Sequence, residues 1–239
     1  MRLYYDFHMH SCLSLCAEDD MTPANIAGMA ALAGLDTFAL SDHQSAKNCP
    51  ACAFHAAQHG LLFLPALELC TREEVHVLCL FAELRHALDF TEYVGQRLLI
   101  TPPARKRSLW RQTIMAENDV PVGQEPLWLG SPADIGIYDT AALVHDAGGL
   151  AIPAHMDRPS ASIIANLGLY DPAMGFALCE LTAGCDEQRF VREHPELRGM
   201  RFIRGGDAHD LAAIPDRQWT IDVPERTPQA VLRVLSGQG

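Results

Sequence analysis

Short apolar runs rich in β-branched and aromatic residues recur along the chain, and between them apolar positions follow helical spacing. Such runs predict β-strands, whereas apolar positions three or four residues apart predict amphipathic helices. The predicted strands cover residues 2–8, 36–41, 61–67, 75–81, 149–154, 176–181, 201–205 and 218–223. This alternation indicates an α/β fold, either a barrel or an open parallel sheet.

Two helix starts are marked by a threonine followed by a proline. Thr22 precedes Pro23, and Thr227 precedes Pro228. A hydroxyl side chain caps the free N–H groups of a first turn, and proline is favoured at the first helical position. Gly34 is placed to end the earlier helix. We therefore expect helices from residue 23 to about residue 33 and from residue 228 onward.

The alternation is interrupted between residues 84 and about 136. Two segments there, near 86–99 and 104–118, have helical spacing, and a loop with glycines and prolines follows them. Loops at one end of a barrel commonly carry function. We expect a single domain over residues 1–239, with a helical insertion at about 84–136 that caps one end of it.

The charge balance is acidic. The chain has 239 residues, of which 49% are hydrophobic, and its 18 basic and 30 acidic residues give a formal net charge of -12. Duplex nucleic acid requires a basic face, so the charge argues against nucleic acid as a partner. The main basic cluster contains Arg105, Lys106, Arg107 and Arg111. It is either a solvated helix face or a patch that steers a substrate.

Neither a membrane segment nor a secretion signal is recognisable. The chain has no run of about 18 apolar residues, and its first residues lack a basic segment followed by an apolar one. We therefore predict a cytoplasmic protein without a membrane partner. Eight cysteines are present, which in that compartment are buried thiols or metal ligands. Cys49 and Cys52 have the spacing of redox motifs, which we interpret as incidental because no second pair accompanies them.

The stretch "YYDFHMHS" at residues 4–11 places polar residues at alternate positions. In a strand, Asp6, His8 and His10 share one face. Two imidazoles about 6–7 Å apart on one face can converge on a metal ion. The alternative is two unrelated surface histidines, so the rest of the chain must decide.

Most of the predicted strands end in a side chain that can bind a metal, and the strand at 75–81 carries one. These residues are His8, His10, Asp42, His43, Glu68, His76, His155, Asp207 and His209. In a barrel, the carboxyl ends of the strands form the active-site face. Buried imidazoles and carboxylates would lose their hydration there without compensation, and divalent cations supply that compensation. The joint pattern favours a metal centre.

This ordered set of motifs resembles the polymerase and histidinol phosphatase (PHP) family of metal-dependent phosphoesterases. The motifs are an HxH after the first strand, an S-D-H, a lone glutamate, two isolated histidines and a closing D-x-H. The resemblance spans the chain except for the 84–136 insertion. It implies a distorted (β/α)7 barrel, similar to a TIM barrel, with two or three divalent ions (Zn, Mn or Fe) at its mouth.

The resemblance also implies a ligand set. A first metal would be held by His8, His10, Glu68 and Asp207. A second would be held by Glu68, which bridges the two ions, together with His76 and His155. A third would use His43, His209 and one residue after the HxH motif.

The chain departs from the family pattern at that last position. The stretch reads "SCLSLCAEDD", in which Cys16, Cys12, Asp19 and Asp20 can coordinate and Leu15 cannot. We favour Cys16, because a thiolate is a good zinc ligand and its distance along the chain from His10 is suitable. A buried, unreactive thiol is the alternative.

The implied activity is hydrolysis of a small phosphate ester, such as a nucleotide, a sugar phosphate or a compound like histidinol phosphate. The attacking group would be a hydroxide between two metal ions, with Glu68, Asp207 and Arg158 as catalytic residues. Asp6 and Asp42 are expected to orient neighbouring histidines. The alternatives are a nuclease acting on nucleic-acid ends and a non-catalytic module that binds metal and a phosphorylated ligand.

Overall fold

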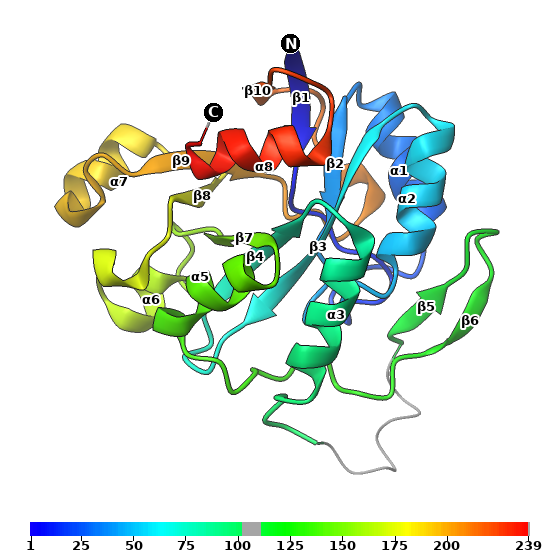
Figure 1. Ribbon diagram of the computed structural model, residues 1–239, viewed down its shortest axis with the longest axis horizontal. Helices are drawn as coiled ribbons and strands as arrows, with labels where there is room; N and C mark the ends of the chain where they lie inside the picture. Colours follow the sequence, from blue (N-terminus) through cyan, green and yellow to red (C-terminus); the bar gives the residue numbers. More distant parts are fainter. Residues whose placement is uncertain (102–110, 239) are drawn as a thin grey trace.

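A curled six-stranded sheet forms the centre of the molecule (Figure 1). The computed structural model describes residues 1–101 and 111–238. The sheet has the order β10-β1-β2-β3-β4-β7, and two smaller sheets pair β8 with β9 and β5 with β6. The strands are β1 (Arg2–Asp6), β2 (Thr37–Leu40), β3 (Leu62–Cys70), β4 (His76–Phe81), β5 (Thr113–Met115), β6 (Pro121–Gln124), β7 (Gly149–Pro153), β8 (Leu178–Thr182), β9 (Arg201–Gly205) and β10 (Thr220–Asp222).

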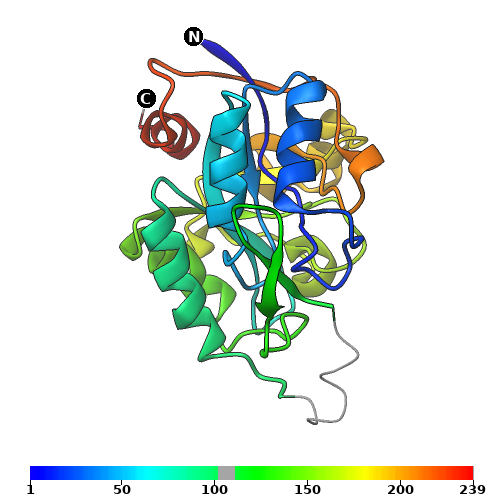
Figure 2. The same cartoon turned by 90° about the vertical axis from the view of Figure 1, so that its right-hand side faces the viewer.

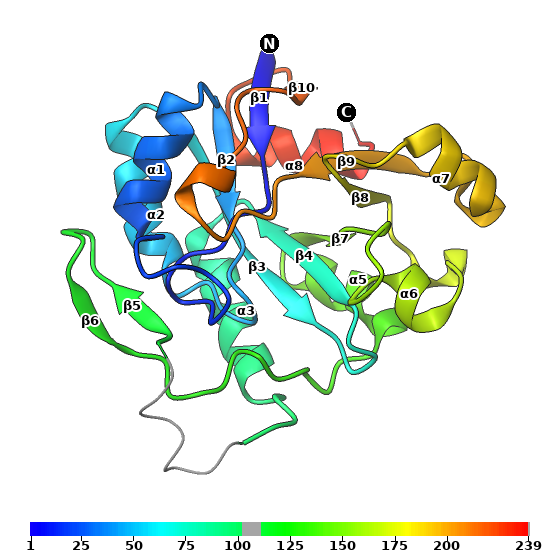
Figure 3. The same cartoon turned by 180° about the vertical axis from the view of Figure 1, so that it is seen from behind.

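Helices surround this sheet, and the last of them packs against its inner side. They are α1 (Pro23–Leu32), α2 (Cys49–Gln58), α3 (Leu84–Gly95), α5 (Ile137–Asp146), α6 (Ile163–Leu167), α7 (Glu187–Glu193) and α8 (Pro228–Ser236), with short 3₁₀ turns at 172–174, 195–197 and 211–213. Figures 2 and 3 show α1 and α2 side by side on the same side of the molecule. Among the described residues, no helix is long and apolar enough to cross a membrane.

The eight predicted strands are all present, with ends that differ from the prediction by at most three residues. Both predicted helix caps are confirmed as well. Thr22 Oγ1 accepts a hydrogen bond from the backbone N–H of Asn25 at 3.3 Å, and Thr227 does the same for Ala230 at 3.2 Å. Gly34, with φ +76°, follows the end of α1, where a left-handed residue suits a helix end.

Strand β4 runs antiparallel to both of its neighbours, whereas β1, β2 and β3 are mutually parallel. Only residues 71–75 join β3 to β4, in a turn closed by the hydrogen bond from Thr71 N–H to Val75 O at 2.9 Å. A parallel connection needs a dozen or more residues, so this link permits only a hairpin. As a result, the beginning of β4 lies at the same edge as the end of β3.

Two hydrophobic clusters hold the fold together. The outer cluster packs helices such as α1, α2 and α3 against the sheet. The inner cluster collects residues from β1, β2, β3, β4, β7, β8 and β9 and from α8, which lies near both chain ends in Figure 1. Side chains from this many strands share one core only if the strands curl around it. The strand pairing itself shows a curled half-barrel and does not establish seven β/α units.

The described part of the 84–136 region contains one predicted helix and one unexpected hairpin. Helix α3 packs on β3 and β4 through buried residues that include Phe90 and Val94. The second predicted helix is wrong in its described part, because residues 113–115 form β5, which pairs with β6. The basic residues Arg105, Lys106 and Arg107 lie outside the described residues.

Candidate metal centre

The predicted ligands gather at the edge of the sheet where β1, β2, β3 and β7 end and β4 begins. His8 and His10 follow β1, and a parallel bridge between Met9 and Ala208 ties this segment to the chain after β9. His43 follows β2 and forms a bridge with Glu68. The segments are thus fixed to one another by backbone pairing at the point where their side chains meet.

The alternation expected through His10 stops with β1. Phe7 belongs to the inner core, where its ring stacks on Tyr5 with centroids 4.6 Å apart, whereas Met9 belongs to the outer core. His8 and His10 therefore do not project from one strand face. They converge from the segment that follows the strand, with ring centroids 5.2 Å apart.

Glu68 lies at the centre of the cluster, with only 1% of its side chain exposed. Its Oε1 is 3.0 Å from His76 Nδ1 and 3.2 Å from His155 Nε2, and its Oε2 is 2.9 Å from His43 Nδ1. Each carboxylate oxygen thus faces a different set of imidazoles. A carboxylate in this position can bridge two cations.

Asp207 completes a tight group with the HxH histidines. Its Oδ1 is 3.1 Å from His8 Nε2 and 3.0 Å from His10 Nε2, and the same two nitrogens are 3.3 and 3.5 Å from the Glu68 oxygens. Ligands about 2.0–2.2 Å from a tetrahedral ion lie roughly 3.4 Å apart. The spacing of these four side chains is therefore that of a coordination shell.

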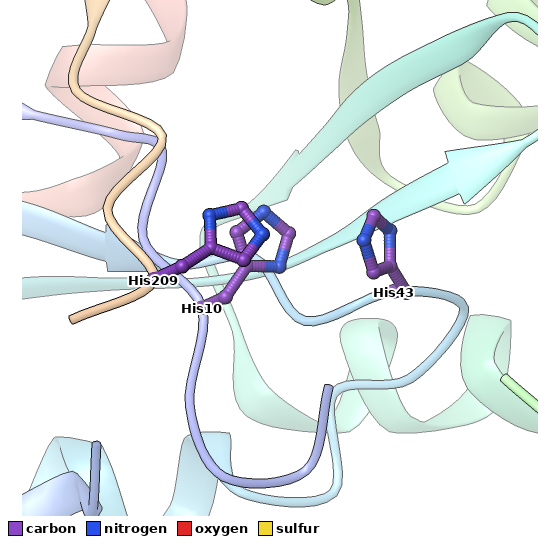
Figure 4. A group of neighbouring side chains, drawn as sticks. All are labelled: His10, His43 and His209. Atoms are coloured by element: carbon purple, nitrogen blue, oxygen red, sulfur yellow. The ribbon is translucent and has the colours of Figure 1, made fainter. Parts of the chain in front are cut away.

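A second part of the cluster contains His10, His43 and His209, whose ring nitrogens lie within 4.8 Å of one another (Figure 4). The rings of His10 and His209 stack, with centroids 4.3 Å apart. His43 also groups with Glu68 and His76 within the same 4.8 Å limit. His43 therefore stands between the region of Glu68 and the region of His209.

Among the residues that the structure describes, several buried nitrogens of this cluster find no hydrogen-bond partner. His8 Nε2 and His10 Nε2 lie close to carboxylate oxygens without hydrogen-bond geometry, and His155 Nδ1 is also unpaired. Unsatisfied buried polar atoms are costly and rare in folded proteins. Imidazole nitrogens and carboxylates that face one another fit a divalent cation between them, so these residues suit the metal ions that the resemblance implies.

The histidines of the cluster differ in ionisation. Burial alone would lower the pKa of His8, but Glu180, Asp207 and Glu68 raise it well above its usual value. Burial lowers the pKa of His10 to about 3, so its ring is neutral near pH 7. Burial alone would raise the pKa of Glu68, but the nearby rings of His76, His8 and His43 hold it well below its usual range. Burial would likewise raise the pKa of Asp207, but His8 and His10 hold it below its usual range. Both carboxylates are therefore charged acceptors.

Two residues of the cluster have strained backbones. His155 has φ +32° and Asp207 has φ +49°, a region that non-glycine residues seldom occupy. Such strain persists only where the surrounding structure imposes it, and it is frequent at functional sites. Here it accompanies the turns that follow β7 and β9, which bring both side chains to the cluster.

Asp6 is predicted to orient a neighbouring histidine ring, but another carboxylate contacts the His8 ring. The Asp6 carboxylate accepts from the backbone N–H groups of His8 and Gly206, at 3.0 and 3.2 Å, and so it holds the chain rather than a ring. The His8 ring is instead contacted by Glu180, with Nδ1 2.9 Å from Oε2. The sequence analysis missed Glu180, although a carboxylate in an apolar strand is the same signal that marks Glu68.

Asp42 acts on the histidines through a serine. Its carboxylate accepts from the hydroxyl groups of Ser11 and Ser14, at 2.6 and 2.7 Å. Ser14 Oγ in turn lies 3.3 Å from His10 Nδ1 and accepts from the backbone N–H of His43 at 3.1 Å. The expected orienting role thus passes through Ser14, a residue the sequence analysis did not single out.

The four candidates for the remaining ligand lie in different surroundings. Burial alone would raise the pKa of Cys16, but hydrogen bonds with the His209 and His43 side chains lower it to about 7. Cys12 is buried, which raises the pKa of its thiol to about 12. Asp19 forms an ion pair with Arg111, and Asp20 is exposed.

Arg158 lies at the rim of the cluster. Its Nη1 is 2.5 Å from Asp207 Oδ2, and 41% of its side chain is exposed. The guanidinium thus contacts the cluster from the solvent side. Cys49 and Cys52, in contrast, are buried at the start of α2, where burial raises the pKa of both thiols, so they lack the reactive thiolate of a redox motif.

Comparison with known proteins gives matches among solved structures only. No family model and no curated protein matches the chain. Endonuclease Q from Pyrococcus furiosus has a TM-score of 0.73 at 19% identity, over 100% of this chain and 57% of that protein. An amidohydrolase from Chromobacterium violaceum, solved with sulfate and without metal, has a TM-score of 0.62 at 20% identity, over 98% and 96% of the two chains.

A candidate metal-dependent phosphoesterase from Bifidobacterium adolescentis has a TM-score of 0.61 at 16% identity, over 98% of this chain and 96% of that one. The chain spans little more than half of endonuclease Q, another structure of which holds a duplex DNA substrate with an abasic lesion at the active site. At these identities the matches establish the fold. They confirm the resemblance to the PHP family at that level.

Proposed function

We propose that this protein is a metal-dependent hydrolase of small phosphate esters. The observation that carries the proposal is the convergence of imidazoles and carboxylates on Glu68, with buried nitrogens that find no hydrogen-bond partner in the described part of the chain. Bound divalent cations would supply the acidity that turns water into a nucleophile near neutral pH and would neutralise phosphate oxygens. The cytoplasmic location remains a prediction from the sequence.

The proposed ligands would form two sets, one for each of two cations. His8, His10 and Asp207 would hold one, His76 and His155 would hold another, and Glu68 would lie between the two. The neutral His10 ring offers a lone pair without first losing a proton, because burial has lowered its pKa. The charged Glu68 and Asp207 compensate the cations where water is largely excluded.

Arg158 is the residue of this chain that we assign to the substrate. A guanidinium presents two parallel N–H groups that match two phosphate oxygens. Its exposed position beside Asp207 allows it to turn toward a phosphate at the rim of the cluster. We propose that it orients the ester and stabilises charge on the phosphoryl group, and that His43, His209 and Cys16 hold a third cation nearby.

Small esters are favoured over nucleic acid by the charge of the protein. The formal net charge of -12 opposes a polyanion, and Glu18, Asp19 and Asp20 are exposed on the segment that also carries Cys16. The nuclease alternative has support of its own in the structural likeness to endonuclease Q. The predicted cap at 84–136 would suit a small substrate, because closed sites bury most of a small ligand.

The decisive experiment is a panel of phosphate esters assayed with the protein loaded with Zn²⁺ or Mn²⁺. We expect hydrolysis of at least one nucleotide, sugar phosphate or amino-alcohol phosphate. His10→Ala and Asp207→Ala should each lose metal and lower the rate at least about 100-fold, because each removes a ligand. Arg233→Ala, on the distant helix α8, is a matched control and should keep full activity.

Three outcomes would contradict this proposal. The first is undiminished hydrolysis by either ligand variant. The second is hydrolysis of oligonucleotide ends but of none of the small esters, with a steep fall in rate as salt rises, which would favour the nuclease. The third is tight binding of metal and of a phosphorylated ligand without turnover of any ester, which would favour the non-catalytic module.

A further inference from the structure

Glu180 is a buried carboxylate that faces the back of the candidate metal centre. It lies in β8, and 2% of its side chain is exposed. Its Oε1 and Oε2 lie 3.1 and 2.9 Å from His8 Nδ1. Oε2 also accepts a hydrogen bond from the backbone N–H of His155 at 3.0 Å. One carboxylate thus contacts two of the segments that carry proposed ligands.

A glycine in β9, Gly205, leaves space for this carboxylate. A Cβ on Gly205 would lie 1.9 Å from Glu180 Oε1 and 2.9 Å from His8 Cβ, so only glycine permits β9 to pass so close. β8 and β9 pair in parallel, with Glu180 opposite Ile203. The position of the carboxylate is therefore imposed by backbone on one side and by the His8 ring on the other.

The two nitrogens of the His8 ring face different partners. Nδ1 faces Glu180, whereas Nε2 faces Asp207 and Glu68 at 3.1 and 3.3 Å without hydrogen-bond geometry. A ring whose Nδ1–H donates to a carboxylate has its lone pair on Nε2 and is a stronger electron donor there. The arrangement therefore sets both the tautomer and the direction of the ring.

We propose that Glu180 is the positioning residue of the metal centre. It holds His8 with the proton on Nδ1 so that Nε2 binds the first cation, and it fixes the turn at His155 through the backbone. The inference rests on the proposed function in one respect, since it requires that the cluster bind metal. It assigns to Glu180 no contact with metal or substrate.

Metal affinity measured without any substrate tests this role. Glu180→Gln keeps the size of the side chain and removes its charge, and competition with a chromophoric chelator gives the affinity for Zn²⁺. We expect the tightest site to weaken by about 10–100-fold, because outer partners of a ligating histidine have effects of that size. Glu187→Gln is the matched control, since Glu187 begins the next helix, is about half exposed and pairs with Arg204.

The outcomes separate this inference from the proposed function. A wild-type protein that binds no Zn²⁺ contradicts the metal-dependent function itself. A wild-type protein that binds Zn²⁺, together with a Glu180→Gln protein of equal affinity, overturns the role of Glu180 alone. Equal weakening by Glu180→Gln and Glu187→Gln would also overturn it, because the effect would then be one of general charge.

A second measurement decides the matter if Glu180→Gln does not fold. Nitrogen-15 NMR of histidine-labelled wild-type protein loaded with Zn²⁺, which is diamagnetic, reports which ring nitrogen carries the proton. The His8 signal, assigned by its loss in His8→Asn, should show a protonated Nδ1 and a metal-bound Nε2. A His8 ring protonated at Nε2 would refute the proposed positioning.

Discussion

Among single residues, Cys16 is the one on which the proposed third metal site depends. Its thiol interacts with His43 and His209, whereas the Cys12 thiol is buried against the carbonyl oxygen of Thr113, 3.9 Å away. The two cysteines are four residues apart in the same loop, yet only one faces the histidines. A thiolate beside two imidazoles is a suitable set of zinc donors.

Replacing this thiol tests the third site. We expect Cys16→Ala to lower the Zn²⁺ content measured by elemental analysis by one ion per chain, because two imidazoles alone hold zinc weakly. Cys185→Ala, a half-buried cysteine in the loop after β8, should leave the content unchanged. An unchanged count in Cys16→Ala would exclude the thiol as a ligand.

The sequence predicted the proposed metal ligands better than it predicted the residues that contact and orient those ligands. His8, His10 and Asp207 were recognisable because metal-binding residue types recur after successive strands, which is a local pattern. The contact between Glu180 and His8 joins residues 172 positions apart and depends on how β8 and β9 approach β1. Ser14 is likewise an ordinary loop serine until the fold places it against Asp42.

At the level of elements, one asparagine links the β5–β6 hairpin to the loop that carries the histidines. Asn48 Nδ2 donates to the carbonyl oxygen of Thr113 at 3.0 Å and to Ser11 Oγ at 2.9 Å. Its Oδ1 accepts from the backbone N–H of Met115 at 2.9 Å. Since Ser11 also donates to Asp42, the hairpin and the loop after β1 share one buried hydrogen-bond network.

Removing that side chain should loosen the hairpin. We expect Asn48→Ala to lower the free energy of unfolding by about 1–3 kcal/mol, because it leaves buried backbone groups of β5 without partners. Urea unfolding followed by circular dichroism measures this change. Asn118→Ala, in the exposed turn of the same hairpin, should change stability by less than about 0.5 kcal/mol. Equal losses in both variants would contradict the anchoring role.

The sequence pattern predicted neither the β5–β6 hairpin nor the antiparallel direction of β4. β5 and β6 are three and four residues long, and all of β6 is exposed, so they lack the apolar run by which strands are recognised. The antiparallel course of β4 follows from the five-residue link at 71–75, which the periodicity of the strand itself does not reveal. The longer buried strands, such as β3, were found because their pattern is local.

At the scale of the whole molecule, buried charged carboxylates are concentrated in the cluster around Glu68. Glu68 and Asp207 are buried with their pKa values held low by neighbouring imidazoles, within a protein that is already acidic. Anything that binds the folded state and not the unfolded chain stabilises the fold by mass action. Cations at this cluster should therefore raise stability as well as support catalysis.

Thermal unfolding with and without metal tests this coupling. At a Zn²⁺ or Mn²⁺ concentration of 100 times Kd, the gain is about 2.7 kcal/mol per site. For a domain of this size, that corresponds to a rise in Tm of roughly 5–10 °C relative to protein in EDTA. His10→Ala should show a smaller rise than the wild type, because one of its ligand sets is broken. A Tm that metal does not move in the wild type, or moves equally in His10→Ala, would show that the clustered imidazoles and carboxylates do not hold the ions.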